Sequence, residues 1–274
     1  MRAPRDDGRK APGLISDDLD ERFTRSVAPM IRRLIIARVS PDSITVAALV
    51  VTLGSALCIG MGRLLVGCLL LLVGGALDFM DGKVAALSGR ATTAGAILDS
   101  TLDRYSDAAV CIGLMLYFAS RGHAATAVAA VVALAGSGVT SYVMAQAEVY
   151  GYTLRAGLLR RQDRVVLLAA GLLLSPLHAP LVEWLASTGF DGAATLPNIP
   201  VAASVWLLAG LTNVSAVQRL TVLRGLARDD TAGLKARETP RPPSGEGLRD
   251  RQLRTLRSVL QRPDLPEERR RDES

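Results

Sequence analysis

The 274-residue sequence contains few aromatic residues and few cysteines. Its aromatic content is 4%, and it has three cysteines and two histidines. All three cysteines lie within apolar stretches: Cys58, Cys68 and Cys111. The sequence has no CxxC pair, and the apolar stretches that contain the three cysteines exclude a disulfide-rich scaffold. We interpret the cysteines as small apolar core residues.

Charge is also missing from long stretches of the sequence. Residues 165–182 and 192–218 contain no Asp, Glu, Lys or Arg, and residues 63–77 contain only Arg63. Apolar stretches of this length are typical of membrane-spanning helices. The distribution of charge therefore excludes a disordered chain and a soluble nucleic-acid-binding protein, although the net charge is +6. We expect no nucleic-acid partner.

The hydrophobic pattern predicts an all-α integral membrane protein with six transmembrane helices within residues 41–225. The predicted spans are residues 41–61, 64–79, 95–120, 124–146, 165–185 and 199–223. The second span is short, so we expect its helix to continue toward Leu87. The fifth span contains Pro176 and Pro180, which predict a kink or break near its outer end.

Polar segments flank the predicted membrane domain on both sides. Residues 17–40 repeat apolar side chains every three or four positions, which predicts an amphipathic helix in the lipid headgroup layer. The same face can also pack on the cytoplasmic ends of the spans. Residues 1–16 are predicted to be disordered. Residues 226–274 are predicted to form a basic, largely disordered cytoplasmic tail attracted to anionic membrane lipid.

The positions of the basic residues predict the orientation in the membrane. Nine of the 32 Lys and Arg residues precede Pro41, and fourteen lie from Arg219 onward. The loops expected on the opposite side carry only Arg63 and Arg121. The positive-inside rule then places both termini, and the segment from Asp78 to Asp103, on the cytoplasmic side of the plasma membrane.

Two pairs of aspartates form the most informative pattern. Asp78 and Asp81 are three residues apart, and Asp99 and Asp103 are four apart, so each pair shares a helix face. Adjacent antiparallel helices can bring the two faces together just below the membrane surface. Four carboxylates at such a place repel one another, and divalent cations would remove this cost. All-oxygen ligands suit two Mg²⁺ or Mn²⁺ ions, which can clamp a diphosphate.

This segment resembles the signature of the CDP-alcohol phosphotransferase (CDP-alcohol phosphatidyltransferase) family. The signature reads Asp, two residues, Asp-Gly, two residues, Ala-Arg, eight residues, Gly, three residues, Asp, three residues, Asp. The sequence matches it, with every spacing kept, at Asp78, Asp81, Gly82, Ala85, Gly95, Asp99 and Asp103. It departs at Ala86, where the family has Arg. Lys83 or Arg90 is a candidate to supply the missing positive charge to the phosphates. The resemblance covers about residues 17–225.

The resemblance implies a membrane enzyme of phospholipid biosynthesis. Such an enzyme transfers a phosphatidyl-type group from a CDP-linked lipid, CDP-diacylglycerol, to a hydroxyl of a polar alcohol or its phosphate, and releases CMP. By the resemblance, the four aspartates bind two metal ions, and Asp103 is also the general base. The residues implied to line the nucleotide site are Gly82, Ala85, Thr92 and Gly95. The resemblance also implies a homodimer.

The acceptor alcohol is left open by the sequence. Residues 141–164 and 217–220 resemble the subgroup that makes phosphatidylinositol phosphate, in which basic residues hold the phosphate of inositol phosphate. Arg161 and Arg219 match two of these basic residues, whereas Met144 and Gln146 stand where the subgroup has Lys and Arg. Beside Asp103, Asp107 can either orient the base or pair with an arginine of the bundle.

Other functions remain possible at the level of sequence. A membrane prenyltransferase also uses Asp pairs, but it typically has about nine spans and a second motif farther along the chain. A divalent-cation carrier would place acids at the bilayer midplane and on several helices. Finally, the loss of the signature arginine at Ala86 is compatible with an inactive relative.

Overall fold

The computed structural model describes residues 5–6, 17–154, 157, 161–190 and 192–238. The predicted disordered segment 1–16, apart from residues 5–6, and residues 239–274 of the predicted tail lie outside this part of the chain. The transmembrane bundle belongs to a compact unit that spans Met1–Leu226. A second unit, Ala227–Ser274, contains the last residues of the final helix.

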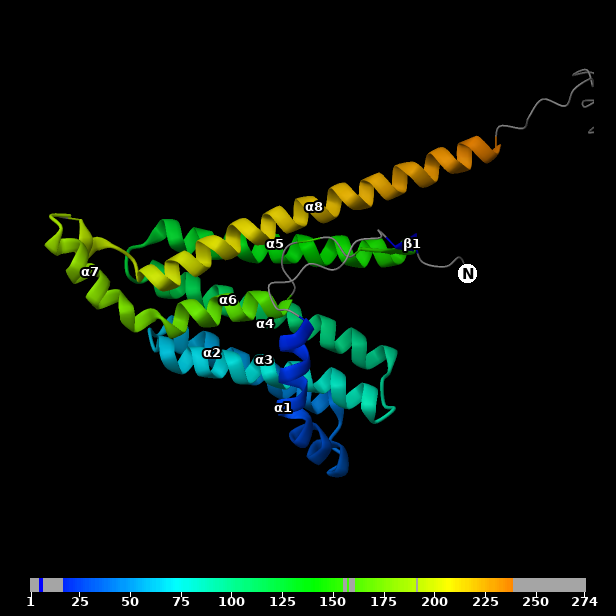
Figure 1. Cartoon of the computed structure of the whole chain (residues 1–274), viewed down its shortest axis with the longest axis horizontal. Coiled ribbons are helices and arrows are strands. Elements are labelled where there is room, and N and C mark those ends of the chain that lie inside the picture. Colours follow the sequence, from blue (N-terminus) through cyan, green and yellow to red (C-terminus); the bar gives the residue numbers. More distant parts are fainter. Residues whose placement is uncertain (1–4, 7–16, 155–156, 158–160, 191, 239–274) are drawn as a thin grey trace, which may run out of the picture. The chain divides into compact units, whose positions relative to one another are not determined.

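The described residues are almost entirely helical, as predicted (Figure 1). The α-helices are α1 (Asp17–Ile36), α2 (Pro41–Gly60), α3 (Leu64–Leu87), α4 (Thr93–Ala119), α5 (Ala124–Val149), α6 (Arg161–Leu173), α7 (His178–Ser187) and α8 (Ile199–Glu238). Two short 3-10 helices cover Ser175–Leu177 and Ala193–Thr195. A minimal parallel pair joins β1 (Arg5–Asp6) to β2 (Tyr152–Thr153).

Among the helices that the structure describes, four are long and apolar enough to cross a membrane: Pro41–Gly60, Leu64–Leu87, Ala124–Val149 and Ile199–Arg228. Residues 161–173 and 175–187 form a pair bent by 41°, which makes a fifth span if the pair counts as one. The helix that begins at Leu64 reaches Leu87, and the chain bends beside Pro176, both as predicted. The prediction of six spans is therefore met only in part.

The predicted span at residues 95–120 corresponds to α4, which is not among these candidate spans because of its charge. Its first half carries Asp99, Asp103, Arg104 and Asp107, which makes it too polar for a membrane span by composition. Its second half nevertheless lies in the common core. Phe118 and Leu114 of α4 are almost completely buried, among side chains from α2, α3, α5, α6 and α8. α4 is therefore a core helix of the bundle with a charged first half.

Small residues allow the helices to approach one another closely. Gly113 on α4 faces the backbone of Ala56 on α2, and a Cβ at Gly113 would collide with the Ala56 carbonyl oxygen. Close contact through small residues is a common way for helices to associate in lipid. Many large apolar side chains point outward instead, including Leu57 and Leu69, which are 60% and 63% exposed. This outer surface suits hydrocarbon as its surroundings.

Helix α1 packs on the membrane helices through its apolar face. Ile31 is buried with Ile44 of α2 and with Met80 and Val84 of α3, and Val27 packs against this group. This is one of the two arrangements that its amphipathic pattern predicts. The contact lies beside Asp81, so α1 helps to fix the end of α3 that carries the aspartates.

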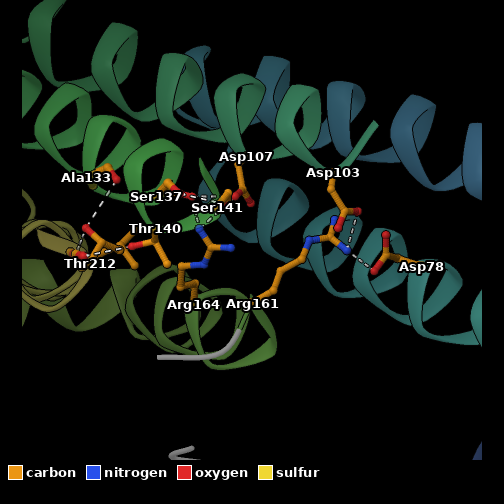
Figure 2. A network of polar contacts seen from close by, with 11 residues as sticks. Asp78, Asp103, Asp107, Ala133, Ser137, Thr140, Ser141, Arg161, Arg164 and Thr212 are labelled. Atoms are coloured by element: carbon orange, nitrogen blue, oxygen red, sulfur yellow. Dashed lines mark hydrogen bonds and ion pairs between the residues drawn. The ribbon is translucent and has the colours of Figure 1, made fainter. Parts of the chain in front are cut away.

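A polar brace links α4, α5 and α6 inside the bundle (Figure 2). Arg164 Nη1 of α6 lies 2.9 Å from Asp107 Oδ2 of α4, and Ser137 of α5 donates a hydrogen bond of 2.8 Å to the same oxygen. Arg164 also donates to the Ser137 hydroxyl. Of the two roles predicted for Asp107, the structure shows the pairing with an arginine of the bundle. The brace holds α6 at a fixed position against α4.

Replacement of Asp107 by Asn should destabilise the protein. The Arg164 guanidinium, whose side chain is only 13% exposed, would lose its carboxylate partner, at a cost of about 1–3 kcal/mol. We expect a lower thermal unfolding temperature in detergent micelles. Removal of both charges, in Asp107→Leu with Arg164→Met, should recover part of the loss, because no unpaired charge remains. An Asp107→Asn protein that unfolds at the wild-type temperature would show that the brace contributes nothing.

Candidate active site

The predicted aspartates lie at neighbouring ends of α3 and α4. One carboxylate oxygen from each of Asp78, Asp99 and Asp103 lies within 4.8 Å of the others. Three of the four predicted metal ligands therefore converge. Helix capping contributes to this arrangement, because Thr92 Oγ1 accepts a hydrogen bond of 3.0 Å from the Gly95 N–H and fixes the start of α4 one to three turns before its aspartates.

Asp81 lies outside this group of three. Its side chain is buried, and its Oδ1 accepts a hydrogen bond of 2.5 Å from the Gly82 N–H. Its other oxygen, Oδ2, is also buried and makes no hydrogen bond. Asp81 and Asp99 line one cavity together, so Asp99 belongs both to the group of three and to the wall that it shares with Asp81.

Arg161 supplies a positive charge to the group of three. The residue begins α6, and its Nη1 forms ion pairs with Asp78 Oδ2 and, at 2.8 Å, with Asp103 Oδ1 (Figure 2). The guanidinium therefore connects α6 with both aspartate-bearing helices. A single guanidinium cannot balance three carboxylates, and Asp81 adds a fourth acidic group nearby.

The described residues fit a divalent metal ion. The donor set consists only of carboxylate oxygens, which Mg²⁺ and Mn²⁺ prefer. Two ligands of one ion lie at most about 4.2 Å apart, because such bonds measure about 2.1 Å, so three oxygens within 4.8 Å of one another need only a small side-chain movement to contact a common ion. The buried Asp81 Oδ2 also lacks a partner, and an unpaired buried carboxylate oxygen is costly.

A cavity of about 220 Å³ opens on one side of the aspartates. All four residues predicted for the nucleotide site line it: Gly82, Ala85, Thr92 and Gly95. Asp81 and Asp99 form its acidic wall. We call it the nucleotide cavity. Gly82 leaves open space there, because a Cβ at this position would meet no atom within 4 Å.

A second cavity, of about 310 Å³, is lined by a different set of residues. Its lining includes Asp103 and both residues predicted for the acceptor, Arg161 and Arg219. Met144 also lines it, so the position at which the subgroup has Lys does face this space. We call it the acceptor cavity. Two aspartates of the group of three thus line different cavities, Asp99 the first and Asp103 the second.

Sequence reasoning missed three features of the acceptor cavity. Arg164 was expected in a loop between helices, but it belongs to α6 and lines this cavity. Ser137 and Glu148 of α5 line it as well. The signal for Ser137 was weak, since a serine among alanines and glycines in an apolar helix is also an ordinary packing residue.

Comparisons with known proteins agree with this geometry. Residues 38–215 match the family model described as CDP-alcohol phosphatidyltransferase. The chain is 32% identical over 202 residues to the phosphatidylinositol phosphate synthase of Mycobacterium tuberculosis. This match covers 72% of this chain and 85% of that protein. It is 29% identical over 230 residues to the enzyme of the same name from Mycobacteroides abscessus, with coverage of 81% and 97%.

Solved structures of the Mycobacterium tuberculosis synthase are also similar. The structure with CDP-DAG bound has a TM-score of 0.60 and 28% identity, and the match covers 73% of this chain and 94% of that one. The structure in complex with manganese and citrate has a TM-score of 0.58, with coverage of 71% and 87%. The family model covers well over half of the chain. The chain is therefore a multi-pass integral membrane enzyme that belongs to the CDP-alcohol phosphatidyltransferase family.

Proposed function

We propose that this enzyme transfers a phosphatidyl group from CDP-diacylglycerol to a hydroxyl of a phosphorylated polar alcohol, and that inositol phosphate is its acceptor. The observation that carries the proposal is that two neighbouring aspartates line different cavities, Asp99 the nucleotide cavity and Asp103 the acceptor cavity. A group transferred between two substrates has to pass from one to the other at such a place. The CDP-DAG-bound synthase from Mycobacterium tuberculosis supports the choice of lipid donor.

The charges of the acceptor cavity favour an anionic acceptor. Four arginines line it: Arg104, Arg161, Arg164 and Arg219. They face two acidic residues, Asp103 and Glu148. Met144 and Gln146 each replace a cation of the phosphatidylinositol phosphate subgroup, and Met144 is the one of the two that lines this cavity, but four arginines still line it. A phosphate on the acceptor therefore has several guanidinium groups within this cavity to bind it.

The aspartates would hold divalent metal ions, which supply charge neutralisation to the diphosphate. We assign one ion to Asp78, Asp99 and Asp103, and a second to Asp81 and Asp99. Asp103 accepts the proton of the acceptor hydroxyl, because it faces the acceptor cavity as well as the cluster. The hydroxyl oxygen forms a bond to the phosphorus that bears the diacylglycerol, and the bond from that phosphorus to CMP breaks.

Arg161 is suited to two tasks in turn. It pairs with Asp78 and Asp103, and it also lines the acceptor cavity. With divalent cations bound to these carboxylates, the Arg161 guanidinium would be free to bind the acceptor phosphate. We also propose that α4 is a sixth span, as the hydrophobic pattern predicts, and that the protein is a homodimer, as the family resemblance implies. Both termini and the active site face the cytoplasm, and the domain boundaries follow residues 17–40, 41–225 and 226–274.

An Asp103→Asn variant should release CMP about 10²–10⁴ times more slowly, because a general base typically contributes that factor. The measurement is CMP release from CDP-diacylglycerol with inositol phosphate. Glu183→Gln is the matched control, since Glu183 is an exposed acid on α7 that lines neither cavity. Full turnover by Asp103→Asn would exclude this residue as the base.

Removal of divalent cations should abolish CMP release. A chelator would leave Arg161 as the main counter-charge of Asp78 and Asp103, with no ion to neutralise the diphosphate. Addition of Mg²⁺ or Mn²⁺ to the stripped protein should restore turnover. Unchanged turnover after complete metal removal would contradict the assignment of the aspartates as metal ligands.

An Arg219→Gln variant should raise the KM for inositol phosphate about tenfold or more, because a charge-assisted hydrogen bond to phosphate is lost. The KM for CDP-diacylglycerol should stay the same, since Arg219 does not line the nucleotide cavity. Arg224→Gln is the control, as an exposed arginine farther along α8. If both variants behave like the wild type, Arg219 does not bind the acceptor. If CMP release requires inositol without phosphate, a phosphorylated acceptor is ruled out.

A further inference from the structure

The nucleotide cavity lacks the arginine that the family signature would bring to it. Ala86 stands at that position, it is exposed, and it does not line the cavity. Three acidic residues do line the cavity: Asp42, Asp81 and Asp99. A nucleotide diphosphate is itself negatively charged, so it needs positive charge on the protein side in addition to bound metal.

Lys83 is placed poorly to compensate for Ala86. Its Nζ lies 5.2 Å from the centre of the Phe79 ring, over the ring face. Lys83 is not among the residues that line the nucleotide cavity. The lysine thus makes a cation–π contact with its own helix instead of facing the nucleotide.

Arg90 is placed well to contact a ligand in the nucleotide cavity. Among the described residues that line the nucleotide cavity, it is the one with a positive charge. It lies in the loop between α3 and α4, so it belongs to the segment that connects the two aspartate-bearing helices. Cations are also favourable beside the C-terminal end of a helix, which is where α3 ends at Leu87.

The local sequence fixes the backbone of Arg90. Gly89 has a φ of +67°, a left-handed conformation that ends α3 and turns the chain back. The Gly89 N–H bonds to the Ala86 carbonyl oxygen at 3.4 Å, and the Arg90 N–H bonds to the Ala85 carbonyl oxygen at 3.1 Å. This is the hydrogen-bond pattern of a Schellman motif. It holds Arg90 next to Ala85, which lines the nucleotide cavity itself.

The side chain of Arg90 is available to a ligand. Its Nη1 donates one long hydrogen bond, 3.4 Å, to the carbonyl oxygen of Arg38 in the turn between α1 and α2. A guanidinium has five N–H donors, and the side chain is exposed. Within the described part of the chain, Arg90 forms no ion pair with the three acids of the cavity.

We propose that Arg90 binds a phosphate oxygen of the CDP diphosphate and so replaces the signature arginine that is absent at Ala86. This inference rests on the proposed function. It assigns the nucleotide-binding charge of this chain to a residue outside the family signature. The signature position and Arg90 lie at the same end of α3, since Gly89 turns the chain back there, and Arg90 is the one of the two that lines the cavity.

The test compares Arg90→Gln with Lys83→Gln. Each variant removes one positive charge near the end of α3, but only Arg90 lines the nucleotide cavity. For Arg90→Gln we expect the KM for CDP-diacylglycerol to rise about tenfold or more. Inhibition by CDP should weaken by a similar factor, whereas inhibition by cytidine should not change. Lys83→Gln should stay within twofold of the wild type.

Transfer of the charge back to the signature position is the second arm. In the double variant Ala86→Arg with Arg90→Gln, most of the lost affinity for CDP-diacylglycerol should return. Equal KM values for Arg90→Gln and Lys83→Gln would overturn the proposal. So would an equal loss of affinity for CDP and for cytidine, because a phosphate contact cannot affect both alike.

Binding without turnover separates this inference from the proposed function. The readout is the rise in thermal unfolding temperature that CDP causes in detergent micelles with Mg²⁺ and no acceptor. A smaller rise for Arg90→Gln than for Lys83→Gln supports the role of Arg90, even if no acceptor yields CMP and the proposed function fails. If CDP stabilises the wild type and Arg90→Gln equally, Arg90 does not bind the diphosphate. This result would not contradict the proposed transferase function.

Discussion

The structure depends on a concentration of negative charge at the end of two membrane-associated helices. Three carboxylates lie close enough to share an ion, and Asp81 adds a buried fourth beside them. Such a group is unstable unless cations balance it. Arg161 supplies one cation from α6, and the brace of Asp107, Arg164 and Ser137 holds α6 close to α4. The packing of α4 and α6 and the chemistry of the site therefore have a common electrostatic origin.

The same constraint explains why the membrane spans were only partly predictable. Hydropathy identifies α2, α3, α5 and α8, which consist mainly of apolar residues. The span predicted over residues 95–120 is not among them, because the charges of the site occupy the first half of α4, whereas its second half is buried in the core. A functional helix thus departs from the composition of a lipid-facing span. The bend beside Pro176 was predictable because proline acts locally on the helix backbone.

Sequence spacing predicted that Asp78, Asp99 and Asp103 come together. It did not predict the side chains of other helices that contact the aspartates of α4. Spacings of three and four residues fix the face on which a side chain lies, and the capped start of α4 then brings Asp99 and Asp103 to Asp78. Spacing does not fix the rotation of one helix against another, which is why Asp81 faces the nucleotide cavity. Contacts such as that of Ser137 with Asp107 join residues 30 positions apart on different helices, and no local pattern encodes them.

Ala86 shows how a departure from a family signature can be interpreted once the fold is known. A signature records residue types at fixed spacing, whereas a phosphate responds to charge at a position in space. The end of α3 can present a cation from within the helix or from the turn that follows it. Here Gly89 turns the chain back, and the Arg90 N–H bonds to Ala85, so the turn returns to the same cavity wall. A single missing arginine is therefore weak evidence for an inactive protein, because the fold offers a second position for the same charge.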